Sequence, residues 1–101
     1  MDKSQLLQSL KQKGFSDKIL NAFSNVKREN FIPKQLKNIA YEDNALPIGS
    51  GQTISQPYTI AITLSLLNLK PKQKVLEVGS GCGYVLALIS EITKSRVYGI
   101  E

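Results

Sequence analysis

The feature that most constrains the fold is a glycine-rich turn between a short strand pattern and a helical pattern. Residues 74–78 form a short, β-branched run, and the turn Gly79-Ser80-Gly81-Cys82-Gly83 follows directly. A helical pattern then covers 84–93, and a second β-branched run covers 96–101. Strand, helix and strand of these lengths predict one βαβ unit with a right-handed crossover. The sequence therefore predicts an α/β fold.

The part of the chain before this unit is predicted to be mainly helical. Ser4–Lys13 and the segment that begins at Ser16 both repeat apolar residues at helical spacing. Pro57 suits the first turn of a third helix, which we expect to end near Leu69. Residues 41–55 combine glycine, proline and polar residues, and they are predicted to form a long irregular loop. Loops of that length in compact domains are usually functional or disordered, and the apolar residues in this one favour function.

A single βαβ unit leaves much of its sheet uncovered. Two parallel strands with one crossover helix expose both sheet edges and much of both faces, whereas an open α/β sheet has more strands. The chain has 101 residues, 42% of them hydrophobic, which suits either one small domain or a piece of a larger one. We therefore expect the chain to be part of a longer protein.

The net charge of +5 is unevenly distributed. Residues 1–38 hold eight Lys and Arg residues against three acids, so the whole excess lies there. A basic segment could attract nucleic acid or acidic peptides. The lysines are scattered, however, with only Phe15 and Phe23 among them before residue 31. The pattern favours a solvated helix surface, and no nucleic-acid partner is expected.

Residue types that are missing or rare exclude several kinds of chemistry. The chain has no histidine, which removes Ser-His-Asp and Cys-His catalysis and most zinc sites, so no metal is expected. Cys82 is the only cysteine, which excludes an internal disulfide and favours a reducing, cytoplasmic compartment. The longest apolar run, Val85–Ile89, is far too short to span a bilayer, so no membrane partner is expected.

The turn has the composition of a nucleotide-binding turn, with an acid two residues ahead of it. Its glycines allow a sharp bend and a close approach of a ligand, and the following helix N-terminus attracts a carboxylate or phosphate. The spacing Gly-x-Gly-x-Gly differs from the dinucleotide pattern, and the leading Glu77 disfavours a pyrophosphate. S-adenosyl-L-methionine fits better, because its amino acid end is zwitterionic and its sulfonium is cationic. Glu101, 18 residues past Gly83, is placed to accept hydrogen bonds from ribose hydroxyls.

The residues predicted from this pattern to bind the cofactor are Glu77, Gly79, Ser80, Gly81, Gly83 and Glu101. The alternative is a purely structural turn with a surface glutamate.

Several segments together resemble one enzyme family. Leu46–Pro57, which reads Leu-Pro-Ile-Gly-Ser-Gly-Gln-Thr-Ile-Ser-Gln-Pro, resembles the hallmark loop of the protein-L-isoaspartate O-methyltransferases. Arg28–Pro33, Ala40–Asp43 and Val75–Tyr84 resemble segments of the same family. The glycine turn alone is shared by class I methyltransferases in general, whereas the loop is specific to this family.

The resemblance implies a repair enzyme that transfers a methyl group from S-adenosyl-L-methionine to the α-carboxylate of L-isoaspartyl residues. Its partners would be isoaspartyl-containing proteins and peptides, and a monomer is expected. The implied fold is a set of N-terminal helices plus the first βαβ unit of a Rossmann-like class I methyltransferase sheet. Residues 1–70 would form the helical region and the substrate and cofactor loop, and 71–101 the start of the cofactor-binding domain.

The same resemblance assigns roles within the loop. Ser55 is implied as the catalytic residue, with its hydroxyl beside the carboxylate and the methyl donor. The residues implied to bind the cofactor are Gln52, Thr53, Ile54 and Ser55, and those implied to bind the substrate are Ile48, Gly49 and Ser55. The alternative role for Ser55 is to cap the following helix, and both roles can hold at once.

Two other functions remain open from the sequence. One is a class I methyltransferase that acts on RNA or a small molecule, for which binding would weaken steeply with salt. The other is an inactive or partial fragment that keeps part of the cofactor pocket and catalyses nothing.

Overall fold

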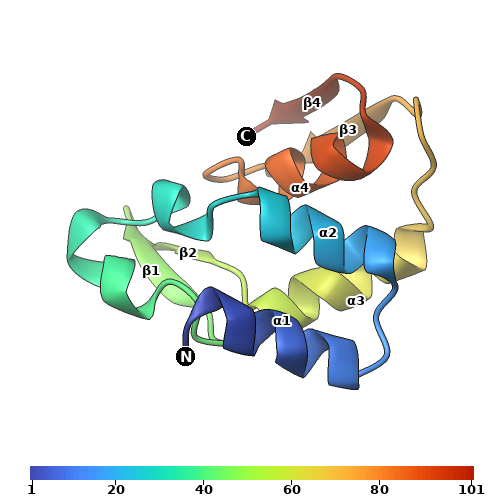
Figure 1. Ribbon diagram of the computed structural model, residues 1–101. Coiled ribbons are helices and arrows are strands. Elements are labelled where there is room, and N and C mark those ends of the chain that lie inside the picture. The colour runs from blue at the N-terminus through green and yellow to red at the C-terminus, as the bar shows by residue number, and fades with distance from the viewer.

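The computed structural model describes residues 1–101 as helices packed beside a small parallel sheet (Figure 1). The elements in chain order are α1 (Lys3–Gln12), α2 (Asp17–Asn25), η1 (Arg28–Phe31), η2 (Lys34–Ile39), β1 (Leu46–Gly49), β2 (Gln52–Ile54), α3 (Pro57–Leu67), β3 (Val75–Val78), α4 (Tyr84–Thr93) and β4 (Val97–Ile100). The prediction of three helices followed by a βαβ unit is confirmed. No helix is long and apolar enough to cross a membrane.

The first helix begins at an acidic cap that the sequence analysis did not identify. The Asp2 carboxylate accepts a hydrogen bond from the Gln5 backbone N–H at 2.9 Å, and the Gln5 side chain accepts one from the Asp2 N–H at 2.8 Å. This reciprocal pair satisfies two N–H groups that a helix N-terminus otherwise leaves free. Ser16, where the second helical segment was expected to begin, is the N-cap of α2, but its hydroxyl forms no capping hydrogen bond.

The prediction of an irregular loop over residues 41–55 is wrong for Leu46–Gly49 and Gln52–Ile54, which form two strands. β1 and β2 form an antiparallel hairpin in which Leu46 lies opposite Ile54, and both side chains are buried against the core. At its tip, Gly49 and Gly51 adopt positive φ angles of 101° and 72°, a conformation that glycine enters at little steric cost. The pairing was hidden because the strands are only four and three residues long.

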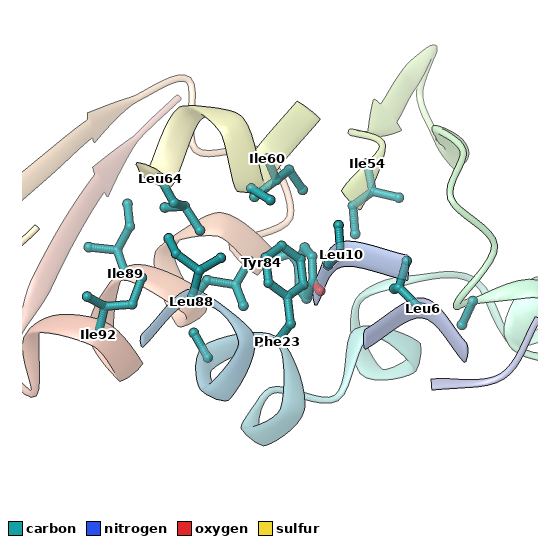
Figure 2. Packing of buried hydrophobic residues seen from close by; sticks show 14 of the residues in the cluster. Leu6, Leu10, Phe23, Ile54, Ile60, Leu64, Tyr84, Leu88, Ile89 and Ile92 are labelled. Atoms are coloured by element: carbon teal, nitrogen blue, oxygen red, sulfur yellow. The ribbon is translucent and has the colours of Figure 1, made fainter. Parts of the chain in front are cut away.

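A single hydrophobic cluster joins the helices, the hairpin and the βαβ unit. Figure 2 shows Leu10, Phe23, Leu64 and Tyr84 converging from α1, α2, α3 and α4. Helices distant in sequence therefore share one core. That core also holds the first residue of α4, which directly follows the glycine turn.

The sheet of β3 and β4 is parallel, with Val75 opposite Val97 and Val78 opposite Ile100. α4 crosses between the two strands on one face of the sheet, as expected of a βαβ unit (Figure 1). The other face has no covering layer among these residues: Leu76, Val78, Tyr98 and Ile100 are 58%, 76%, 54% and 53% exposed. We expected much of both faces to be uncovered; the structure leaves this one uncovered, while α4 packs on the other.

Candidate functional site

A cavity of about 100 Å³ lies between the end of the hairpin and the turn that precedes α4. Its lining comes from two segments far apart in the sequence: residues 53–55 at the end of β2, and residues 77–85 around the turn. The lining residues are Thr53, Ile54, Ser55, Glu77, Gly79, Ser80, Gly81, Cys82, Tyr84 and Val85. The fold therefore brings the two segments that the sequence marked as functional to one place.

Backbone hydrogen bonds hold the turn against β4. The N–H groups of Gly79 and Ser80 donate to the Ile100 carbonyl at 2.6 and 3.1 Å. Gly79, Gly81 and Gly83 have φ angles of 75°, 56° and 87°, and a Cβ added at any of them would meet nothing within 4 Å. Glycine is needed in this turn for its backbone conformation, while the space beside it is open to a ligand.

Two carboxylates lie beside the turn. One oxygen of Glu101 accepts a hydrogen bond from the Gly81 N–H at 2.7 Å. Glu77 points one buried carboxylate oxygen, Oε1, into a position where no donor of the chain reaches it. Burial, together with the nearby charge of Glu101, raises the pKa of Glu77. An unpartnered buried acceptor in a cavity lining suits a ligand that carries a hydrogen-bond donor or a positive charge.

Gly99 in β4 makes room for the turn. A Cβ on Gly99 would lie 2.7 Å from both Cβ and Oγ of Ser80 and would also collide with the Leu86 side chain. No real Cβ tolerates such contacts, so the turn and the start of α4 pack directly onto the backbone of β4. The strand thereby fixes where Ser80 lies in the cavity wall.

The hydroxyl of Ser55 is free, because another side chain performs the capping at this helix. The N-cap residue of α3 is Gln56, whose side chain forms no capping hydrogen bond. The Asp43 carboxylate instead accepts a hydrogen bond from the Tyr58 backbone N–H at 2.9 Å. Ser55 is exposed at the cavity and only its carbonyl forms a hydrogen bond within the chain. Capping is therefore not the role that Ser55 has in this structure.

A buried arginine that contacts the cavity wall was not among the predicted site residues. Arg28 is 0% exposed, and its guanidinium donates to the carbonyls of Ala40, Asn44 and Ser55 at 2.7, 3.2 and 3.1 Å. It also stacks on the Tyr84 ring, 5.2 Å from the ring centroid. Arg28 lies within a segment of the family resemblance, but no spacing in the sequence predicts its hydrogen bonds or its contact with Tyr84.

The structure brings together most of the predicted site residues and leaves some apart. Those that line the cavity are Thr53, Ile54, Ser55, Glu77, Gly79, Ser80 and Gly81. Gly83 is the N-cap of α4, and Glu101 is hydrogen-bonded to the turn. Gln52, Ile48 and Gly49 lie in the hairpin outside the cavity lining. The roles of all these residues stay predictions.

Larger hollows occur elsewhere on the surface, but none has comparable chemistry. One of about 530 Å³ near the end of α4 is lined by five polar residues, and one of about 320 Å³ lies between α2 and α3. Neither contains a buried polar atom without a partner or a glycine-rich backbone. We therefore regard the smaller cavity as the candidate site.

Comparison with known proteins points to the same family as the sequence motifs. The model of the protein-L-isoaspartate(D-aspartate) O-methyltransferase family matches residues 1–101. The protein-L-isoaspartate O-methyltransferase of Petrotoga mobilis is 56% identical over 93 residues, which cover 91% of this chain and 43% of the relative. That of Methanothrix thermoacetophila is 46% identical over 103 residues, 100% of this chain and 49% of the relative. The chain thus spans about half the length of the curated relatives it matches.

Two solved structures share the fold. A protein-L-isoaspartate O-methyltransferase has a TM-score of 0.90 at 34% identity, over 99% of this chain and 34% of its own. A Plasmodium falciparum protein described as a member of the same enzyme class, in complex with S-adenosyl-L-homocysteine, has a TM-score of 0.83 at 32% identity. That likeness covers 100% of this chain and 49% of the other. The arrangement of helices, hairpin and parallel strands is therefore one that solved proteins also adopt.

Proposed function

Since this chain belongs to the protein-L-isoaspartate(D-aspartate) O-methyltransferase family, we propose that the protein repairs damaged proteins by methyl transfer. The methyl group would pass from S-adenosyl-L-methionine to the α-carboxylate of L-isoaspartyl residues. The observation that carries the proposal is the cavity in which Ser55 and the glycine turn meet. A structural turn with no ligand would not need an open wall and a free serine hydroxyl on opposite sides.

The turn side of the cavity fits the methyl donor. The unpartnered oxygen of Glu77 can accept a hydrogen bond from the ammonium of the donor, and the open glycine backbone allows close approach. The cavity is smaller than the roughly 300–1,000 Å³ usual for small-molecule sites. These residues would therefore hold the amino acid end and the sulfonium, and Glu101 would accept from the ribose. When bound, the donor supplies an electrophilic methyl carbon on a sulfonium sulfur.

The hairpin side of the cavity fits the methyl acceptor. A carboxylate is ionised at pH 7 and is already a nucleophile, so no general base is required. The Ser55 hydroxyl would donate a hydrogen bond to one carboxylate oxygen, with Ile48 and Gly49 on the substrate side. The protein then has to align the reacting atoms and exclude water, and positioning of this kind supplies on the order of 7–11 kcal/mol of barrier reduction.

The proposed product explains why such a methylation is a repair. The nitrogen of the isoaspartyl amide bond attacks the methyl ester, methanol leaves and a succinimide forms, which water can reopen to normal aspartate. In the same proposal, residues 1–70 supply the substrate and cofactor loop and 71–101 the start of the cofactor-binding domain. We also propose a monomeric, cytoplasmic enzyme; the free thiol of Cys82 suits the reducing compartment that this implies.

The proposal is tested with the full-length protein that contains this chain. Methyl incorporation from labelled S-adenosyl-L-methionine is measured with an L-isoaspartyl peptide and with the matched aspartyl peptide, beside a calorimetric titration with S-adenosyl-L-homocysteine. We expect binding of S-adenosyl-L-homocysteine and methylation of the isoaspartyl peptide alone. Binding without discrimination between the two peptides would contradict the proposed substrate, and no binding would contradict the proposed donor.

A further inference from the structure

The two walls of the cavity come from separate segments, and one buried side chain contacts both. Arg28 donates from Nη2 to the Ser55 carbonyl at 3.1 Å and stacks on the ring of Tyr84. Tyr84 is the first residue of α4 and directly follows the glycine turn. We propose that Arg28 is a positioning residue that sets Ser55 against the donor-binding turn, an inference that rests on the proposed methyl transfer.

The planar guanidinium suits this task because its acceptors lie on three different segments. Nε donates to the Ala40 carbonyl at the end of η2, and Nη2 donates to the carbonyls of Asn44, before β1, and Ser55, after β2. Both ends of the hairpin are thereby held by one rigid group. A lysine has a single donor atom on a flexible stem, so it cannot reproduce this fork.

Arg28 and Tyr84 are themselves fixed by their neighbours. The Arg28 backbone N–H donates to the Tyr41 hydroxyl at 3.2 Å, and that hydroxyl donates to the Glu29 carboxylate. On the other side, the Tyr84 ring packs against Phe31 with ring centroids 5.4 Å apart. The contact between Arg28 and Tyr84 therefore joins two residues that are each held by further contacts.

Part of the Arg28 side chain forms no bond that would stabilise the fold. Arg28 forms no ion pair, its Nη1 has no hydrogen-bond partner, and the buried hydroxyl of Tyr84 has none either. Burial lowers the pKa of the Arg28 guanidinium from its usual value. Replacing Arg28 by an apolar side chain removes the donor to the carbonyls of Ala40, Asn44 and Ser55, so stability and rate have to be measured together. A charged group kept here without a carboxylate partner is better explained by the geometry that it imposes on Ser55.

The test compares Arg28→Met and Arg28→Lys in the full-length protein. The quantities measured are the single-turnover rate of methyl transfer to an L-isoaspartyl peptide, the affinity for S-adenosyl-L-homocysteine and the melting temperature. A misplacement of about 1 Å costs on the order of 100-fold in rate, so Arg28→Met should lower the rate roughly 30- to 100-fold. The S-adenosyl-L-homocysteine affinity should stay within about threefold, because the glycine turn keeps its backbone hydrogen bonds.

Arg28→Lys should also lower the single-turnover rate, by about fivefold or more, because it keeps the charge but not the fork. The matched control is Leu6→Ala, which opens the core beneath α1 and lowers the melting temperature without touching the cavity. Below its melting temperature this control should transfer the methyl group at the wild-type rate.

Several outcomes would overturn the inference. One is that either Arg28 variant transfers the methyl group at the wild-type rate. Another is that Leu6→Ala, with the same melting temperature as an Arg28 variant, loses as much of the rate. If Arg28→Met does not fold, the rate of Arg28→Lys decides the matter alone. If the wild type and the Arg28 variants methylate the peptide at the same rate, only the role of Arg28 is contradicted. A wild-type protein that does not methylate it contradicts the proposed function itself.

Discussion

The two sides of the cavity are held in place by different kinds of bond. On the hairpin side, the Arg28 side chain donates to the Ser55 carbonyl from a fully buried position. On the turn side, the N–H groups of Gly79 and Ser80 donate to the Ile100 carbonyl, and Glu101 supplies the one side-chain acceptor, for the Gly81 N–H. This difference indicates on which side of the cavity a substitution can change ligand binding without changing the fold. Side-chain changes at the turn should alter binding without altering the turn, whereas the hairpin side depends on a few buried side chains.

The largest expected effect is at Glu77, the carboxylate on the turn side. In Glu77→Gln the donor ammonium loses a charged acceptor, which is worth about 2–3 kcal/mol, so S-adenosyl-L-homocysteine should bind roughly 30- to 150-fold more weakly. Calorimetric titration of the full-length variant measures this loss. Stability should stay the same or rise. Because burial raises the pKa of Glu77, the folded state favours its neutral form, and its charge lowers stability as the pH rises through that pKa.

Glu91→Gln is the control for this prediction. Glu91 is a surface glutamate that pairs with Lys94 on α4, at 3.0 Å and away from the cavity, so the donor affinity should not change. A Glu77→Gln protein that binds the donor normally but melts earlier would mean that Glu77 serves the fold and not the ligand.

The next effect is at Ser55, on the hairpin side. Its hydroxyl forms no hydrogen bond within the chain, so Ser55→Ala should leave the melting temperature unchanged. Turnover of an isoaspartyl peptide should fall about 10- to 30-fold, the equivalent of one hydrogen bond to a charged group. Ser65→Ala, an exposed serine on α3, is the control and should behave as wild type. Parallel losses of turnover and melting temperature in Ser55→Ala would return this residue to a structural role.

A smaller effect tests whether the turn is fixed by backbone packing. Gly99→Ala places a Cβ against Ser80, and we expect the free energy of unfolding of the full-length protein to fall by about 1 kcal/mol. Adding Ser80→Gly removes the atoms that the new Cβ meets at 2.7 Å, so the double variant should recover part of that loss in a denaturant titration. Strictly additive losses would show that the Ser80 contact is not what restricts Gly99.

The smallest effect is a pH dependence of donor binding. As the pH falls toward the raised pKa of Glu77, its carboxylate takes up a proton and no longer accepts from an ammonium. The affinity for S-adenosyl-L-homocysteine should therefore weaken between pH 7 and pH 5 by less than about tenfold. Glu77→Gln should abolish this dependence. Tighter binding at the lower pH would contradict the assignment.

What the sequence could predict was local in the chain. The βαβ unit and its turn occupy residues 74–101, and their periodicity and glycine spacing are visible in one short stretch. The grouping of Glu77 with the turn followed from their adjacency. The meeting of Thr53–Ser55 with that turn came from the family resemblance, and the structure now places both in one cavity lining.

What the sequence could not predict depended on contacts across the fold. The hairpin was not predicted because its short strands become recognisable only when Leu46 and Ile54 pair over the core. The contacts of Arg28 were not predicted because its hydrogen-bond partners are three backbone carbonyls, which any residue type provides. The Asp43 cap of α3 was not predicted for a related reason. Its carboxylate accepts from the Tyr58 N–H, which lies 15 residues later in the chain.

The central claim is that the methyl donor lies between the glycine turn and Ser55. The most direct test is a crystal structure of the full-length protein with S-adenosyl-L-homocysteine bound. We expect the ligand sulfur to face the Ser55 hydroxyl across the cavity and the ligand ammonium to lie on Glu77. A ligand bound elsewhere, or a cavity filled by packed side chains with Ser55 turned away from it, would contradict the claim.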